Sequence, residues 1–94
     1  MDLKVSYQKA TTADEAYDIA SKIITPEYIA KWKIKADILR NDTDRQLKAK
    51  GKGFLLELSF TDTEAQLKCD LSLMLRPFKK TVLEKMEEKL KRHI

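Results

Sequence analysis

The sequence predicts an α+β domain in which a curved, mainly antiparallel four-stranded sheet carries its helices on one face. Four stretches alternate apolar and polar residues, which predicts half-buried strands. Two other stretches repeat apolar residues at three- and four-residue intervals, which predicts amphipathic helices. With 94 residues, of which 43% are hydrophobic and 36% are charged, the chain suits a single folded domain spanning 1–94.

The first third of the chain is expected to form a strand followed by a bent helical arm. Alternation across 2–9 predicts the strand. Thr12 and Glu15 have the spacing of a capping box, so a helix is expected to begin directly after Thr12. A proline suits the first position of a helix, which predicts a short second helix from Pro26 to about residue 31.

The alternation resumes at Trp32 and predicts a second strand, followed by a turn at 41–44. The third strand then changes parity, because its apolar residues are odd-numbered before Gly51 and even-numbered after Gly53. Glycines beside such a slip favour a β-bulge, so one long bent strand is expected. The apolar face predicted for the second strand consists of Trp32, Ile34, Ala36 and Ile38.

A fourth strand and a C-terminal helix complete the predicted order β-α-β-β-β-α. The strand alternates across 65–73, after a tight connection at 61–63. The helix is expected to start at Pro77 and to cover the sheet with an apolar stripe. Long strands bent around this helix also suggest a reduced helix-grip fold as the alternative architecture. The stripe consists of Phe78, Val82, Leu83, Met86 and Leu90.

The residue counts argue against several classes of protein. A single cysteine, Cys69, cannot form an internal disulfide, and no apolar signal segment follows the first residues, so a cytoplasmic location is expected. No apolar stretch approaches the length of a transmembrane segment. Cys69 and His93 are the only soft metal ligands, and no phosphate-binding loop or nucleophile elbow occurs. We therefore expect no cofactor, no metal site, no catalytic residues and no enzymatic activity.

Lysines on the polar face of the predicted sheet form the candidate site for an anionic partner. Like charges side by side on paired strands are unfavourable, so such a patch suggests an anionic partner. The alternative is that these lysines only solvate the sheet and prevent aggregation at its edge. The last nineteen residues carry the whole net charge of +4. The predicted patch consists of Lys33, Lys35, Lys48, Lys50 and Lys52.

A second candidate site is apolar, and its residues either line a pocket or fill the core. Aromatic residues that stack on bases stand on the exposed face of single-strand and RNA binders, whereas those of this set are expected to point inward. Nucleic acid is therefore disfavoured as a partner. An open sheet edge also allows a homodimer. The apolar set consists of Trp32, Phe54, Leu56, Leu58, Phe60, Phe78, Val82 and Met86.

Four features give the chain a family resemblance: the opening strand with the Glu15-Ala16 helix, Trp32 at the head of the second predicted strand, the Gly51 and Gly53 segment, and the sequence Leu-Ser-Leu-Met-Leu-Arg-Pro-Phe-Lys at 71–79. In these features it resembles a family of small bacterial proteins named polyhydroxyalkanoic acid system proteins. The family pattern also has a His after the first strand and a Gly-Asp after the tryptophan, which this chain lacks. The resemblance implies association with polyhydroxyalkanoate granules, through the granule surface or a granule-associated protein, and supplies no catalytic residues.

These observations predict a non-enzymatic accessory or interaction protein that uses a basic sheet face to contact an anionic partner. Two alternatives remain open from the sequence. One is a small domain of the helix-grip kind that binds an apolar ligand. The other is a weak binder of nucleic acid.

Overall fold

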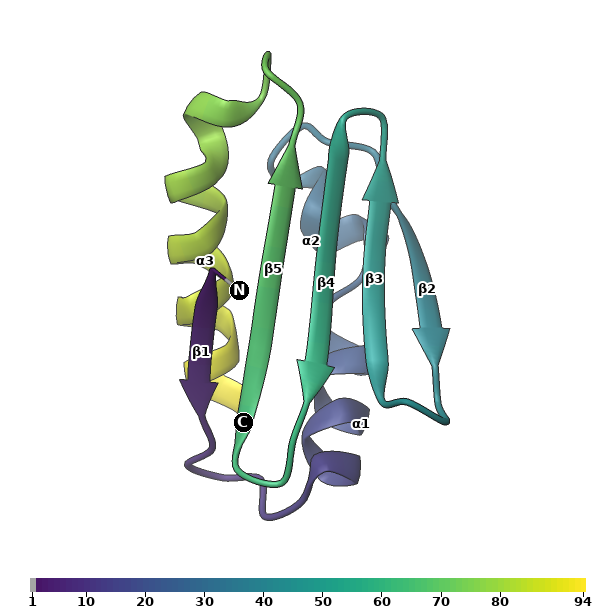
Figure 1. Ribbon diagram of the computed structural model, residues 1–94, viewed down its shortest axis with the longest axis vertical. Helices are drawn as coiled ribbons and strands as arrows, with labels where there is room; N and C mark the ends of the chain where they lie inside the picture. Colours follow the sequence, from purple (N-terminus) through teal and green to yellow (C-terminus); the bar gives the residue numbers. More distant parts are fainter. Residues whose placement is uncertain (1) are drawn as a thin grey trace.

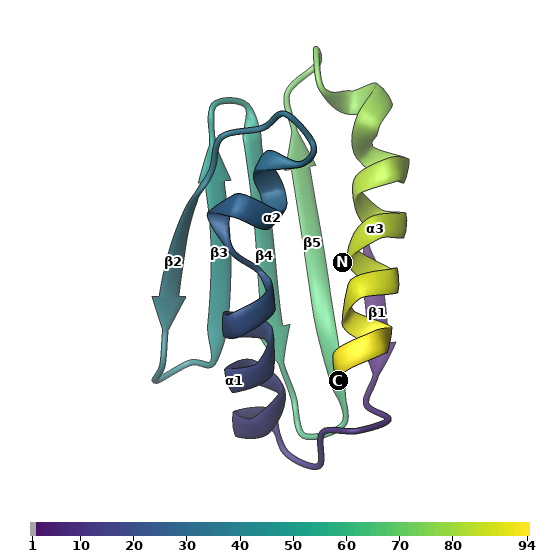
Figure 2. The same cartoon turned by 180° about the vertical axis from the view of Figure 1, so that it is seen from behind.

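A computed structural model describes residues 2–94 and shows a five-stranded antiparallel sheet with its α-helices packed on one face (Figures 1 and 2). The strand order is β1-β5-β4-β3-β2, so the first strand pairs with the last. The α+β class is confirmed, with one strand more than expected. The elements are β1 (Leu3–Ser6), α1 (Ala13–Ile23), α2 (Pro26–Ala30), β2 (Asp37–Asn41), β3 (Gln46–Gly51), β4 (Phe54–Phe60), β5 (Glu64–Leu71), a 3₁₀ turn at Arg76–Phe78 and α3 (Lys79–His93).

The additional strand arises because the predicted long, bulged third strand is a hairpin of β3 and β4. Gly51 pairs with Phe54, and Lys52 and Gly53 form the two-residue loop between them. Residues that pair across two strands point to the same face of the sheet. In this register odd-numbered residues of β3 pair with even-numbered residues of β4, so both sets point to the same face. Gly53 takes a φ of 70°, which a tight turn requires and glycine adopts without strain. The change of parity therefore marks a hairpin, and the expected β-bulge was wrong.

The second predicted strand is also corrected, because β2 begins at Asp37 and not at Trp32. Lys33 lies in the turn after α2 with a φ of 60°, a conformation that interrupts an extended strand. Residues 34–36 then pass over the end of β3. A Cβ atom built on Gly51 would lie 2.1 Å from the backbone oxygen of Lys35, so only glycine permits this close approach.

The core lies between the sheet and the helices. α1 approaches the sheet closely because three of its buried residues are alanines. α3 starts two residues later than predicted, since Arg76–Phe78 forms a 3₁₀ turn, and it packs Val82, Met86 and Leu90 inward as expected. The sheet contributes the buried residues Val5, Leu47, Ala49, Phe54, Leu56, Leu58, Phe60, Ala65, Leu67 and Cys69.

Contacts near both ends of the chain hold α3 against β1 and β5. The backbone N–H groups of residues 8–10 all donate to the oxygen of Ile94, at 2.8–2.9 Å. The Asp2 carboxylate accepts from the backbone N–H of Cys69 at 2.8 Å and lies 3.1 Å from Lys79 Nζ. The hydrogen bond from Cys69 is the largest of the causes that lower the pKa of Asp2, and the ammonium group of Lys79 adds to it. The C-terminal helix is thus fixed at both of its ends.

The close approach over Gly51 gives a test of the fold. We expect Gly51→Ala to lower the free energy of unfolding by about 1–3 kcal/mol, because the added methyl group must displace the backbone at Lys35. Urea unfolding measures this difference. Lys52→Ala in the adjacent loop is the control and should change stability by less than about 0.5 kcal/mol. Equal stability of both variants would contradict this close approach of Lys35 to Gly51.

Candidate interaction surface

The structure keeps only part of the predicted patch together: Lys35, Lys50 and Lys52 line one open pocket, together with Glu27 and Asp37. Lys48 and Lys50 are exposed on β3 and face away from the helices. Lys33 and Lys35 lie in the connection before β2, and Lys52 lies in the loop of the β3–β4 hairpin. The expectation that all five share the polar sheet face is corrected, because the strand predicted to carry Lys33 and Lys35 starts only after them.

The outer sheet face itself alternates in charge. Lys48 stands opposite Glu57, with Nζ and Oε1 3.9 Å apart, and Glu57 in turn stands opposite Lys68. Lys50 of β3 stands opposite Asp37 on the neighbouring strand β2. Rows of opposite charges stabilise a solvated sheet and leave no basic field on it.

Three connections meet at one end of the molecule, at the top of Figure 1. The backbone N–H of Ser72 donates to the oxygen of Gly53 at 2.8 Å, which joins the β5–α3 connection to the β3–β4 loop. The close approach of Lys35 to Gly51 joins the α2–β2 connection to the same strand end. We call these three connections, residues 31–36, 52–53 and 72–78, the basic end.

The basic end carries five positive side chains and no carboxylate. Within residues 2–94, none of the five lies within ion-pair distance of an Asp or Glu, although eight other Lys and Arg side chains do. All five are exposed. Their charge is therefore available to an anionic partner. They are Lys31, Lys33, Lys35, Lys52 and Arg76.

The same end exposes large apolar side chains. Leu73, Met74 and Phe78 are 79%, 88% and 54% exposed, and Leu39 on β2 is the only other such residue in the described part of the chain. Sequence alternation placed Leu73 inside, but β5 ends at Leu71 and the chain turns there. Phe78, predicted to be in the apolar stripe of α3, lies in the 3₁₀ turn instead, outside the α-helical period of that stripe.

A groove of about 540 Å³ opens between the α2–β2 connection and the start of α3. Trp32 forms one wall and packs edge-to-face against Tyr28 and Phe54, with ring centroids 5.2 and 6.5 Å apart. Of the predicted apolar set, Trp32, Phe78 and Val82 line the groove, while Phe54, Leu56, Leu58, Phe60 and Met86 are buried in the core. The other lining residues are Lys31, Lys33, Ile34, Leu75 and Thr81.

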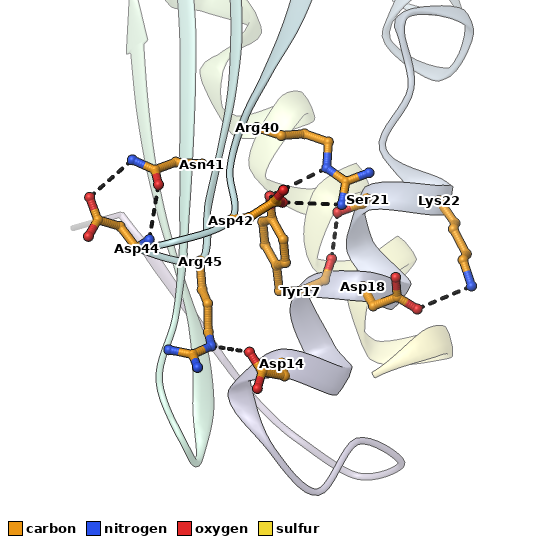
Figure 3. Close-up of polar contacts among 10 residues, drawn as sticks. All are labelled: Asp14, Tyr17, Asp18, Ser21, Lys22, Arg40, Asn41, Asp42, Asp44 and Arg45. Atoms are coloured by element: carbon orange, nitrogen blue, oxygen red, sulfur yellow. Dashed lines mark hydrogen bonds and ion pairs between the residues drawn. The ribbon is translucent and has the colours of Figure 1, made fainter.

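At the opposite end, a polar cluster joins α1 to the β2–β3 turn (Figure 3). The hydroxyl of Tyr17 donates to Asp42 Oδ1 at 2.6 Å, and Arg40 Nε donates to the Tyr17 oxygen at 3.4 Å. Burial of the ring, followed by the hydrogen bond to Asp42, raises the pKa of Tyr17. Nearby, Arg45 forms an ion pair with Asp14.

This cluster fastens two elements together and lacks the features of a catalytic site. The Asp42 side chain is 78% exposed, and its Oδ1 accepts hydrogen bonds from Tyr17 and Arg40, so it stands in no enclosed site. Sequence reasoning missed the cluster because Tyr17 and Asp42 are 25 residues apart. Tyr17 stands at a core position of the helix, which gave no signal of a polar role.

The described residues contain no group of three or more His, Cys, Asp or Glu side chains arranged to hold a metal ion. No helix in that part of the chain has the length and apolar character needed to cross a membrane. Comparison of the chain with family models, curated proteins and solved structures finds no match.

The polar cluster gives a stability prediction. Tyr17→Phe should lower the free energy of unfolding by about 0.5–1.5 kcal/mol, because it removes the hydrogen bond that joins α1 to Asp42. Arg45→Gln removes an exposed, solvent-screened ion pair nearby and should lower stability less than Tyr17→Phe does. Thermal and urea unfolding of the two variants measure both effects. A larger loss in Arg45→Gln than in Tyr17→Phe would contradict this assignment.

Proposed function

We propose that this chain is a non-enzymatic interaction protein that binds an anionic partner through the basic end. The observation that carries the proposal is the set of five exposed positive side chains around apolar residues, none of which forms an ion pair within residues 2–94. Glu27 and Asp37 lie near Lys35 and Lys52 but outside ion-pair distance of them. The resemblance to the polyhydroxyalkanoic acid system proteins suggests an accessory role at a storage granule. A granule boundary offers apolar polyester, and ionised groups on it or on its proteins would supply the negative charge.

The distribution of charge along the molecule supports an approach in which the basic end points toward the anionic partner. The turns at the opposite end, 42–45 and 61–63, contain three aspartates and one arginine, and the first turn of α1 beside them adds Asp14 and Glu15. The last turn of α3 also lies toward this end, but Lys91 and Arg92 form ion pairs there with Glu87 and Glu88. The longest dimension of the molecule, 37 Å, separates the two groups. Such a separation turns the basic end toward a negative surface during approach.

The basic end also serves the proposal better than the sheet face does. Lys48 and Lys50 remain on that face, but acidic side chains stand beside both of them. Neighbouring carboxylates reduce the local positive potential and compete with an anionic partner. We therefore assign the contact to the three connections and not to the strands.

Co-sedimentation with isolated polyester granules across a salt series tests the proposal. We expect Lys33→Glu/Lys52→Glu to weaken binding by about tenfold or more, because the contact is electrostatic. For the same reason, added salt should weaken binding of the unchanged protein. Lys4→Glu/Lys85→Glu is the matched control, because it reverses two exposed, unpaired lysines outside the basic end. Equal loss in both double variants would show a dependence on net charge alone and would contradict the assignment to this end.

A second candidate function, binding of a small apolar ligand, is supported by the groove. The helix-grip alternative rests on two short helices after the first strand and a long C-terminal helix against the sheet. The groove of about 540 Å³ lies within the size range of small-molecule sites and has apolar walls. Lys31 and Lys33 at its rim suit a ligand with an acyl chain and a negatively charged head.

Trp32 is the only tryptophan, so its fluorescence reports on the groove. We expect titration with dodecanoate, below the concentration at which it forms micelles, to change Trp32 emission saturably. Phe78→Ala should weaken this response several-fold because it removes an apolar wall, whereas Leu39→Ala, a truncation of similar exposure on the outer sheet face, should leave it unchanged. An unchanged emission spectrum throughout the titration would reject this candidate.

A further inference from the structure

Two large apolar side chains stand at the tip of the turn that follows β5. The backbone N–H groups of Leu75 and Arg76 donate to the oxygen of Ser72 at 2.9 and 3.0 Å, which makes Leu73 and Met74 the two central residues of the turn. Such positions favour Gly, Pro, Asn, Asp and Ser for reasons of backbone geometry and solvation. Leucine and methionine there serve neither the turn nor the core, since both project into solvent.

The base of this turn is fixed to the rest of the molecule. Ser72 donates to Gly53 across the neighbouring hairpin, and the N–H of Phe78 donates to the oxygen of Leu75 at 2.9 Å. Leu75 is partly buried and packs against the core. The tip is therefore held in place before it meets a partner, which reduces the entropy lost on binding.

Positively charged residues lie near the apolar tip. Arg76 follows it directly in the chain, and Lys52 belongs to the loop that is hydrogen-bonded to its base. Lys33 lines the groove together with Leu75, the residue after the tip. An apolar projection with cations near its base is complementary to a surface that has phosphate groups outside and acyl chains just beneath.

The composition of the tip favours a lipid surface over a protein partner. Leu73 and Met74 are the most exposed large apolar side chains of residues 2–94, at 79% and 88%, and Arg76 follows them directly. A bilayer needs no complementary shape, because headgroups and chains move to accommodate the inserted residues.

We propose that the basic end docks on an anionic phospholipid bilayer and inserts Leu73 and Met74 at the boundary between headgroups and acyl chains. This inference rests on the proposed function, since it names the anionic surface that the basic end binds. Lys33, Lys52 and Arg76 contact lipid phosphates, while the sheet and helices stay folded outside the bilayer. No segment of the chain crosses the bilayer in this arrangement.

The first experiment compares binding to vesicles of pure phosphatidylglycerol with binding to vesicles of pure phosphatidylcholine. We expect binding to the anionic vesicles only, weakened by salt. Leu73→Ser/Met74→Ser should weaken this binding by about tenfold or more, because it removes the inserted apolar side chains. The double variant should not lower the melting temperature, because both side chains are exposed in the free protein. Leu39→Ser, which removes an exposed apolar residue elsewhere, is the matched control and should bind like the unchanged protein.

The second experiment places a reporter at the tip. Met74→Cys can be labelled with an environment-sensitive maleimide dye, because the native Cys69 is buried and burial raises the pKa of its thiol to about 11. We expect a blue shift of the dye on phosphatidylglycerol vesicles and quenching by lipids that carry a quencher on the acyl chain. The same dye on Thr63→Cys, in the exposed turn at the opposite end, should show neither change.

The outcomes separate this inference from the proposed function. If Lys33→Glu/Lys52→Glu loses vesicle binding but Leu73→Ser/Met74→Ser does not, the basic end binds anions and the insertion is rejected. Binding of polyglutamate as tight as that of the vesicles would likewise assign the end to acidic protein and reject the lipid. If the lysine variant binds like the unchanged protein, both proposals fail.

Discussion

The single apolar face of the sheet is the constraint on which the rest of the structure depends. Five strands present a continuous inner surface, from Val5 at one edge to Leu47 and Ala49 near the other, that water would otherwise contact. Only one side needs to be covered, so α1, α2 and α3 all lie there and the opposite face remains solvated. The helices are therefore occupied by the core, and contacts with other molecules are left to the connections and the outer face.

An antiparallel sheet then sorts the connections into two groups. The chain enters β2, passes from β3 to β4 and leaves β5 at one end, and it makes the β2–β3 and β4–β5 turns at the other. Along the sequence these connections alternate between basic and predominantly acidic composition. Strand alternation thus converts a pattern in sequence into a separation of charge in space. The apolar tip at Leu73 and Met74 and the groove beside Trp32 fall on the positive side of that separation.

Two corrections show why the candidate site could be predicted only in part. The parity change at Gly51 and Gly53 was visible in the sequence, but a bulge and a two-residue hairpin loop produce the same change. The alternation of 32–38 was equally visible, yet Lys33 adopts a positive φ and the chain crosses over Gly51 before it joins the sheet. Both wrong predictions placed lysines on the sheet face, although these lysines belong to neighbouring connections.

The sequence by itself determined the class of fold, most helix and strand positions, and the residues that fill the core, because each of these follows from the spacing of apolar residues along a short segment. It also contained the alternation of basic and acidic connections. Only the tertiary structure decided which connections meet, which lysines lie apart from carboxylates, and that Leu73 and Phe78 face solvent. These properties depend on strand order and on contacts between residues far apart in the chain, such as Ser72 with Gly53 and Tyr17 with Asp42. Local periodicity carries no information about such contacts, so the surface had to be found in three dimensions.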